Sequence, residues 1–243
     1  MQRSINGLIG YHMRATDGEI GKVVDFYFDD DTWTIRYLIV KTGNWFSGRE
    51  VLISPDALVK TYWESGIFNA NLTKEQIRNS PDIDTDRPVS RQQEIALHAY
   101  YPWQSYWGSG FYPGGIWGIT DSSPNIDRKI IKEADNTDNH SDDDLHLRST
   151  RQVTGYHIHA TDGEIGHVKD FIMDDHTWKL VCLEVDTHNW LGGKKVLLEV
   201  RHIREVQWIN SKVFVDVSVG SIKNSTSFDE VGSKHPEIGN KIL

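Results

Sequence analysis

The feature that most constrains this chain is an internal repeat. The segment GYHMRATDGEIGKVVDF at 10–26 recurs as GYHIHATDGEIGHVKDF at 155–171, an offset of 145 residues. Between 10–53 and 155–198 the offset holds without a gap, and 25 of 44 positions are identical. Copies this far apart do not fit a solenoid, whose repeats are shorter. A chain of 243 residues permits one large or two small domains, and the repeat predicts two.

Each copy has the pattern of a small β-structure. Short stretches suited to strands flank turn dipeptides such as Asp17-Gly18 and Asp162-Gly163. Gly21 and Gly166 follow these turns closely, at positions where a bulge or a close backbone approach is expected. About six short strands in each copy, with a turn every 8–12 residues or so, predict a small closed barrel.

Three local signals add detail to this prediction. Trp63 matches Trp208 at the same offset, but the alignment then slips by one residue and places Phe68 opposite Phe214. A capping box, T-x-x-Q, begins at Thr73 and predicts one helical turn. A second box, S-x-x-Q, begins at residue 90 and predicts a helix that ends before residue 102.

The predicted fold class is all-β, with two tandem small β-barrels, short helices and an aromatic, glycine-rich connector. The gapless similarity and the length of the connector further predict that the barrels pack as a pseudo-two-fold pair, in effect a covalently linked dimer. The expected boundaries are a first barrel domain at 1–84, a short helix with the aromatic connector and an acidic flexible linker at 85–149, a second barrel domain at 150–228, and a loose C-terminal tail at 229–243.

Charge and composition argue against several classes of protein. The net charge is −9, and the segment 121–144 contributes −5 of it through eight acids and three bases. Such an acidic chain is not expected to bind nucleic acid. A single cysteine, Cys182, cannot form an internal disulfide. Since no run of 18 apolar residues occurs, we expect no membrane span and a cytoplasmic location.

The connector at 100–118 is the main candidate for partner binding. It holds eight aromatic residues with five glycines and two prolines, so a regular helix or strand is not expected. Aromatic side chains dominate the energetics of protein interfaces. Alternatively, these rings pack back on the barrels, because an exposed patch of that size promotes aggregation. The candidate partner-binding residues are Trp103, Tyr106, Trp107, Phe111 and Trp117.

A histidine group in the second copy is a weak candidate for a metal site. His157 and His159 lie two residues apart on one predicted strand, and His167 lies across the hairpin. Imidazoles so placed are ligands for Zn²⁺ or Ni²⁺. The first copy has Arg14 and Lys22 where the second has His159 and His167, so the favoured interpretation is exposed polar residues without a metal.

Candidate catalytic groups are also weak. The acids at 29–31 lack the spacing of a calcium-binding loop and suit a turn instead. There is no nucleophile elbow, phosphate-binding loop or dinucleotide fingerprint. Cys182 lies in a strand at the place of Tyr37 in the first copy, as a packing residue would. We therefore predict no catalytic residue, no cofactor and no enzymatic activity.

The repeated motif resembles the PRC-barrel family. The most specific part is DGEIGKVVD at 17–25, which recurs as DGEIGHVKD at 162–170. This family includes the barrel of the photosynthetic reaction-centre H subunit, the C-terminal domain of the ribosome-maturation factor RimM and stand-alone bacterial proteins. The resemblance covers about two-thirds of the chain, and it implies a β-barrel used mainly for protein interaction and assembly.

The leading hypothesis is a non-enzymatic protein-interaction module with an unknown protein partner. Two alternatives stay open. One is an accessory protein related to the reaction-centre H subunit, which would assist assembly of an electron-transfer complex. The other is a barrel that binds a small molecule or a metal.

Overall fold

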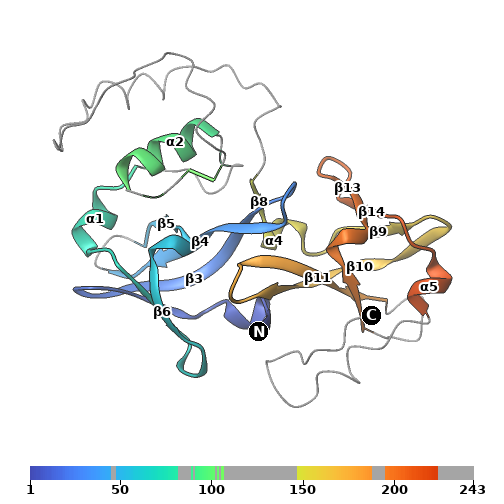
Figure 1. Ribbon diagram of the computed structural model, residues 1–243, viewed down its shortest axis with the longest axis horizontal. Coiled ribbons are helices and arrows are strands. Elements are labelled where there is room, and N and C mark those ends of the chain that lie inside the picture. Colours follow the sequence, from blue (N-terminus) through green and yellow to red (C-terminus); the bar gives the residue numbers. More distant parts are fainter. Residues whose placement is uncertain are drawn as a thin grey trace.

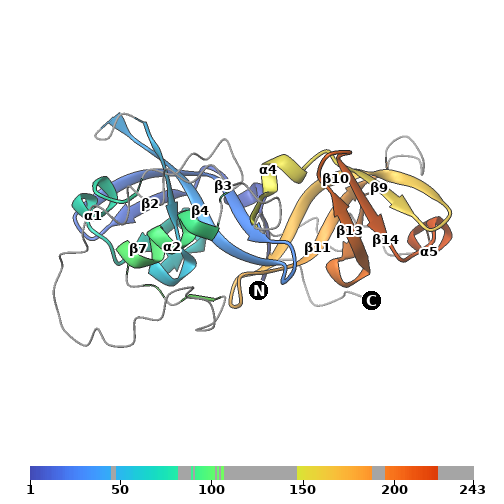
Figure 2. The ribbon, with the colours of Figure 1, turned by 90° about the horizontal axis from the view of Figure 1, so that it is seen from above.

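The protein is seen here in a computed structural model. The described residues are 1–44, 48–81, 89, 91–101, 103, 105, 106, 147–187 and 195–223. They form the predicted all-β fold of two small barrels, which lie side by side along the long axis of the molecule (Figures 1 and 2). The acidic linker and the C-terminal tail expected from the sequence lie outside the described residues.

Each barrel has six strands in the same order, as the sequence predicts. In both, the second strand is a long, curled strand that pairs with its neighbours on either side. The strands of barrel 1 are β2 (His12–Ala15), β3 (Gly18–Asp29), β4 (Thr34–Thr42), β5 (Glu50–Ile53), β6 (Leu58–Tyr62) and β7 (Ile67–Ala70). The strands of barrel 2 are β9 (His157–Ala160), β10 (Gly163–Asp174), β11 (Lys179–Asp186), β12 (Lys195–Glu199), β13 (Ile203–Gln207) and β14 (Lys212–Val215).

Short helices connect the strands. Helix α1 (Lys74–Arg78) has the predicted capping box, with both hydrogen bonds between Thr73 and Gln76 present. Helix α2 (Arg91–Tyr100) begins directly after residue 90, as predicted, and lies against barrel 1 in Figures 1 and 2. The other described elements are α4 (Thr150–Val153), α5 (Val219–Lys223) and the 3₁₀ turns η1 (Asn6–Leu8), η3 (Pro55–Ala57), η4 (Trp63–Ser65) and η6 (Val200–His202).

Two glycines allow the close backbone approach that the sequence predicts. A Cβ atom on Gly21 would lie 2.0 Å from the carbonyl oxygen of Lys41, and one on Gly166 would lie 2.1 Å from that of Asp186. The register of the β9–β10 pair also shifts just before Gly166. The second and third strands of each barrel can approach so closely only because these positions have no side chain.

The hairpin turn of each copy lies one residue earlier than the Asp-Gly dipeptide. Gly18 is already paired with Ala15, so the two turn residues are Thr16 and Asp17. The carboxylate of Asp17 accepts a hydrogen bond from the amide of Lys74 at 2.9 Å. In this way a turn acid satisfies a free amide at the start of helix α1.

The register between the two copies does not slip. Phe68 pairs with Met13, and Val213 pairs with Ile158, so these two pairs are equivalent at an offset of 145. Phe68 and Val213 are both fully buried, whereas Phe214 packs against His159. The predicted match of Phe68 to Phe214 is therefore wrong, because it aligned residue type rather than the face of the strand.

Each half of the chain contributes a short strand to the other half. Strand β1 (Gln2–Ser4) precedes barrel 1 but pairs with β10 of barrel 2. Strand β8 (Leu147–Ser149) precedes barrel 2 but pairs with β3 of barrel 1. The two strands are equivalent at the offset of 145, so the exchange is reciprocal. The sequence predicts that 147–149 belong to the linker, and this is wrong, because a strand this short has no periodicity that reveals it.

The exchanged strands are fixed by equivalent polar contacts. The hydroxyl of Ser4 donates to the buried carboxylate of Asp170, and that of Ser149 donates to Asp25. The guanidinium of Arg3 pairs with Asp175 and lies over the ring of Trp63. Equivalent contacts, each shifted by the offset, join Arg148 to Asp30 and to Trp208.

The barrels also share one core. The amide of Ile35 donates to the carbonyl of Trp178 at 2.8 Å, and the amide of Leu180 donates to that of Trp33 at 2.7 Å. Phe28 and Phe171, from different barrels, have ring centroids 5.5 Å apart. The main apolar cluster runs through both halves without a break. The two barrels are thus paired through reciprocal contacts.

Candidate functional site

The described part of the aromatic connector packs back onto barrel 1. Tyr101, at the end of α2, is buried and stacks on Trp103, with ring centroids 4.2 Å apart. Burial raises the pKa of the Tyr101 phenol to about 12. Trp103 in turn lies 6.5 Å, between ring centroids, from Tyr37 in β4. The positions of these rings agree with the alternative in which the connector packs back on the barrels. The other candidate residues, Trp107, Phe111 and Trp117, lie outside the described residues.

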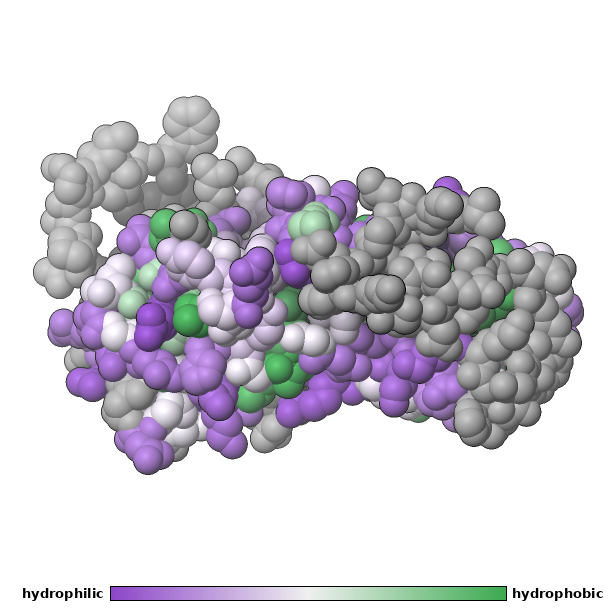
Figure 3. All heavy atoms as spheres, turned by 90° about the horizontal axis from the view of Figure 1, so that it is seen from below, coloured by the Kyte–Doolittle hydropathy of each residue, from purple (hydrophilic) through white to green (hydrophobic). Residues whose placement is uncertain are grey.

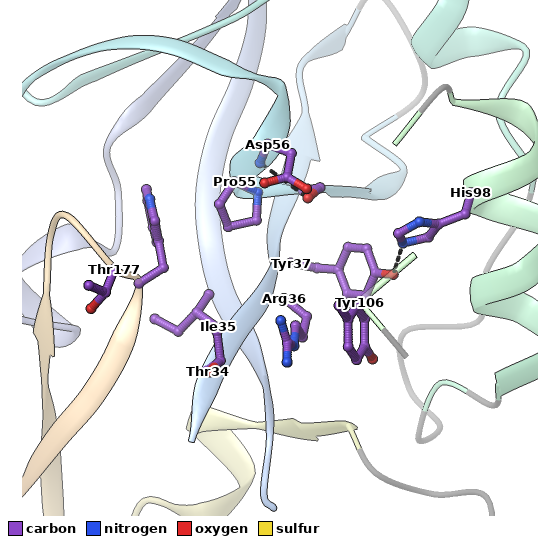
Figure 4. A pocket seen from close by; sticks show the side chains of 11 residues that line it. Thr34, Ile35, Arg36, Tyr37, Pro55, Asp56, His98, Tyr106 and Thr177 are labelled. Atoms are coloured by element: carbon purple, nitrogen blue, oxygen red, sulfur yellow. Dashed lines mark hydrogen bonds between the residues drawn. The ribbon is translucent and has the colours of Figure 1, made fainter. Parts of the chain in front are cut away.

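A polar cluster is enclosed between β4 and α2. Glu94, only 1% exposed, accepts hydrogen bonds from the hydroxyls of Tyr37 at 3.0 Å and Tyr106 at 2.6 Å. The Tyr37 oxygen also lies 2.8 Å from Nε2 of His98, as the dashed line in Figure 4 shows. Because Tyr37 has one hydroxyl proton and gives it to Glu94, Nε2 of His98 carries a proton and donates to Tyr37.

This cluster holds α2 and the connector on the barrel. Glu94 and His98 are four residues apart and so project from one face of α2. A buried carboxylate is costly unless its oxygens are hydrogen-bonded. The two tyrosine hydroxyls meet that need, and the connector must return to the barrel to bring Tyr106 into contact.

Arg36 extends the cluster toward solvent. Its guanidinium carbon lies 3.7 Å from the ring centroid of Tyr106, a cation–π contact. Its Nη2 atom lies 3.1 Å from Oγ1 of Thr32 and 3.6 Å from a carboxylate oxygen of Asp29. Its Nε is buried without a hydrogen-bond partner. A buried donor of this kind favours an incoming acceptor.

A cavity of about 150 Å³ adjoins Arg36 (Figure 4). It lies where barrel 1 meets the β10–β11 turn of barrel 2. Ligand pockets usually measure about 300 Å³ or more, so this cavity suits a single side chain or a very small molecule. It is lined by Thr34, Ile35, Arg36, Tyr37, Ser54, Pro55, Asp56, His98, Tyr106, Thr177 and Trp178.

The equivalent place in barrel 2 has different chemistry. At the offset of 145, Val181 replaces Arg36, Cys182 replaces Tyr37 and Arg201 replaces Asp56. Burial raises the pKa of the Cys182 thiol to about 12, and such a thiol is not reactive at neutral pH. Within the described residues, the polar cluster therefore belongs to barrel 1 alone.

The histidine candidates lie on the β9–β10 hairpin, as predicted. His157 is paired opposite His167, and its Nδ1 lies 2.7 Å from a carboxylate oxygen of Glu164. His159 packs on Phe214, with ring centroids 5.4 Å apart. Among the described residues, no group of three His, Cys, Asp or Glu side chains could hold a metal ion.

Sequence reasoning did not single out Arg36, Glu94 or His98. One sequence signal pointed to the polar cluster: Tyr37 of the first copy is replaced by Cys182 in the second, although the two copies are otherwise similar. The partners of Tyr37 come from α2, which has no equivalent in the repeat at 155–198. Only the tertiary structure brings them together.

The described surface is otherwise unremarkable in its apolar content. On the face shown in Figure 3, hydrophobic residues are scattered among hydrophilic ones. The described large hydrophobics that are exposed are Met1, Ile9, Val59, Tyr62, Ile95 and Ile209. Among the described helices, none has the length and apolarity needed to cross a membrane.

Comparison with known proteins identifies the repeated unit. The family model of the PRC-barrel domain matches residues 2–68 and 151–222. An uncharacterized protein of Deinococcus radiodurans is 34% identical over 74 residues, which is 30% of this chain and 26% of that protein. The matched segment thus spans about a quarter of this relative's length.

Proposed function

This chain belongs to the PRC-barrel family, with one copy of the domain in each half, and from that premise we propose that it is a non-enzymatic protein-interaction module. The paired barrels serve as a rigid platform. The site around Arg36, Tyr106 and the adjoining cavity receives a protruding side chain of a partner protein. The setting is the cytoplasm, as the sequence analysis expects.

The buried, unpaired Nε of Arg36 beside the cavity is the observation that supports this proposal most directly. Arg, Tyr and Trp are the residue types that dominate interface hot spots. All three line this cavity, as Arg36, Tyr106 and Trp178. A partner side chain with an oxygen acceptor would pair with the Nε donor and exclude water from it.

The position of the cavity explains why two barrels would be joined so firmly. Its walls come from both halves, since Trp178 belongs to barrel 2 and Arg36 to barrel 1. The reciprocal strand exchange fixes these walls relative to each other. A preformed site loses less entropy when the partner binds.

Site-specific photo-crosslinking in the source organism tests the proposal. A photoreactive amino acid replaces Asp56 at the cavity, and in a matched protein it replaces Arg201, the equivalent residue of barrel 2. We expect a discrete crosslinked partner from position 56 and none from position 201. In the Arg36→Ala background, the crosslink from position 56 should disappear.

Equal crosslinking from the two positions would contradict this assignment of the site. So would a crosslink from position 56 that survives the loss of Arg36. A small-molecule function is the second candidate, because the cavity could hold a very small ligand. It would be favoured if position 56 gave no protein crosslink while a small carboxylate, such as acetate, raised the melting temperature of the natural protein but not of Arg36→Ala.

A further inference from the structure

Three exposed cations lie on the outer face of barrel 1. They are Arg14 in β2, Lys22 in β3 and Lys41 in β4. Lys22 is paired directly opposite Lys41, so the two side chains project from the same face of the sheet. The neighbouring residues Val23 and Val40 are 0% exposed and belong to the core. The two lysines therefore point away from the core, toward solvent.

His12 and Glu19 complete this surface. His12 is paired opposite Lys22 and, two residues from Arg14 in the same strand, it lies on the same face. Its Nδ1 lies 2.7 Å from a carboxylate oxygen of Glu19. This hydrogen bond lowers the pKa of the Glu19 carboxyl, and the nearby charges of Arg14 and Lys22 act in the same direction. We call the surface formed by Arg14, Lys22 and Lys41 with His12 and Glu19 the basic face.

The stability of the sheet does not explain the cations of the basic face. Within the part of the chain that the structure describes, Arg14, Lys22 and Lys41 form no ion pair, although Glu50 of β5 is paired opposite Lys41. Two like charges directly opposite each other destabilise a sheet. Lysines can protect an edge strand from aggregation, but β3 and β4 are each paired on both sides at this point.

The equivalent face of barrel 2 lacks these permanent cations. At the offset of 145, the three cations are replaced by His159, His167 and Asp186. The contact between His12 and Glu19 is repeated in barrel 2 at the same distance of 2.7 Å. Nε2 of His167 lies 4.0 Å from a carboxylate oxygen of Asp186, where barrel 1 has two lysines. The same fold thus forms without the cations, so folding does not require them.

The spacing of the cations suits a short acidic segment. Neighbouring strands are about 5 Å apart, and side chains two residues apart along a strand are separated by about 7 Å. Carboxylates on alternate residues of an extended segment have the second spacing. A nucleic acid fits less well, because its charge continues along the backbone and would extend from three cations onto the rest of a chain whose net charge is −9.

We propose that the basic face of barrel 1 binds a short acidic segment of another protein, whose carboxylates pair with Arg14, Lys22 and Lys41. Such a segment would also relieve the repulsion between the two lysines. This inference goes beyond the proposed function and does not rest on it, because the cavity beside Arg36 receives a single side chain and either site can exist without the other.

A fluorescent peptide of eight glutamates tests the proposal. The full chain is added at low salt, and binding is followed by fluorescence anisotropy. We expect binding that is lost when the salt concentration is raised to about 0.5 M, because salt screens exposed charges. In Lys22→His combined with Lys41→Asp, which copies barrel 2, the Kd should rise about tenfold or more. The melting temperature, measured by circular dichroism, should not fall, whereas a purely structural role of the lysines would lower it.

Lys169→His combined with Arg204→Asp is the matched control. It changes the formal charge by the same amount at two exposed residues of barrel 2. Its Kd should stay within about twofold of that of the natural protein, because distant exposed charges are screened. An equal loss of affinity in the two double variants would overturn the proposal, and so would a natural protein that does not bind the peptide. A strand of eight thymidine nucleotides that binds as tightly as the peptide would overturn the choice of an acidic protein segment.

The reverse exchange keeps the test decisive if the first double variant does not fold. His159→Arg, His167→Lys and Asp186→Lys together give barrel 2 the three cations of the basic face. We expect a second peptide to bind to the same chain, with the salt dependence of the first. An unchanged number of bound peptides in this folded variant would contradict the proposal.

Discussion

The carboxylate of Asp25 accepts a hydrogen bond from the hydroxyl of Thr150 at 2.8 Å, across 125 residues of sequence. Asp25 belongs to the most specific part of the family motif, yet its partner comes from the segment that leads into the other barrel. The equivalent carboxylate, Asp170, accepts from Ser4 and from the amide of Asn6. The motif acid therefore joins the two barrels.

Replacing Asp25 should strongly destabilise the protein. In Asp25→Ala, the donors Thr150, Ser149 and the amide of Arg151 lose a buried acceptor. We expect the free energy of unfolding, measured with urea, to fall by about 3 kcal/mol or more. The control variant Glu64→Ala, in an exposed turn, should change it by about 0.5 kcal/mol at most. Similar losses in the two variants would contradict the role of Asp25.

The stability should depend on pH through Asp170. Burial raises the pKa of this carboxyl in the folded state, although hydrogen bonds from Ser4, Asn6 and Phe171 partly oppose the rise. The folded state therefore binds the proton more tightly than the unfolded chain does. The resulting stabilisation is full below the pKa of the unfolded chain and is lost as pH rises through the folded pKa.

Asp170→Asn removes this titration. We expect the variant to be less stable than the natural protein by a larger margin at low pH, about 4, than at pH near 7. Urea unfolding at the two pH values measures both margins. Ile209→Ser, at a side chain that is 99% exposed, serves as the control. The difference in free energy of unfolding between this variant and the natural protein should not change with pH. A margin for Asp170→Asn that grows with rising pH would contradict the direction of the pKa shift.

The close approach at Gly21 should tolerate no side chain. In Gly21→Ala, the new Cβ would lie 2.0 Å from a backbone oxygen that cannot move without breaking the sheet. We expect a loss of about 3 kcal/mol or more in the free energy of unfolding. Gly7→Ala is the control, since its Cβ would meet Ser4 only at 3.5 Å. Comparable stability of the two variants would show that the crossing strands can separate.

The cluster under α2 should stabilise the helix on the barrel. Tyr37→Phe keeps the ring but removes the hydroxyl that Glu94 and His98 share. We expect a loss of about 1–2 kcal/mol, with faster hydrogen exchange confined to α2. Val59→Ala, at a side chain of barrel 1 that is 71% exposed, should leave both quantities unchanged. Uniformly faster exchange throughout barrel 1 would argue against a local role of the cluster.

Local patterns were sufficient to predict most of the elements. The turn acids, the alternating strands and the box at Thr73 act over a few residues, so their consequences can be read from neighbouring positions. The same holds for Gly21 and Gly166, whose missing side chains matter wherever two strands cross closely. The mismatch of Phe68 with Phe214 shows where residue type misleads, because the face of a strand depends on its pairing partner.

The sequence by itself determined that the chain folds as two similar six-stranded barrels, since a gapless repeat imposes the same local geometry twice. Only the tertiary structure decided that β1 and β8 are exchanged. Three-residue strands have no periodic pattern, and their hydrogen-bond partners lie far away in sequence. The cluster of Tyr37, Glu94 and His98 was decided in the same way. A buried carboxylate requires donors, and which donors reach it depends on how α2 is placed against the barrel.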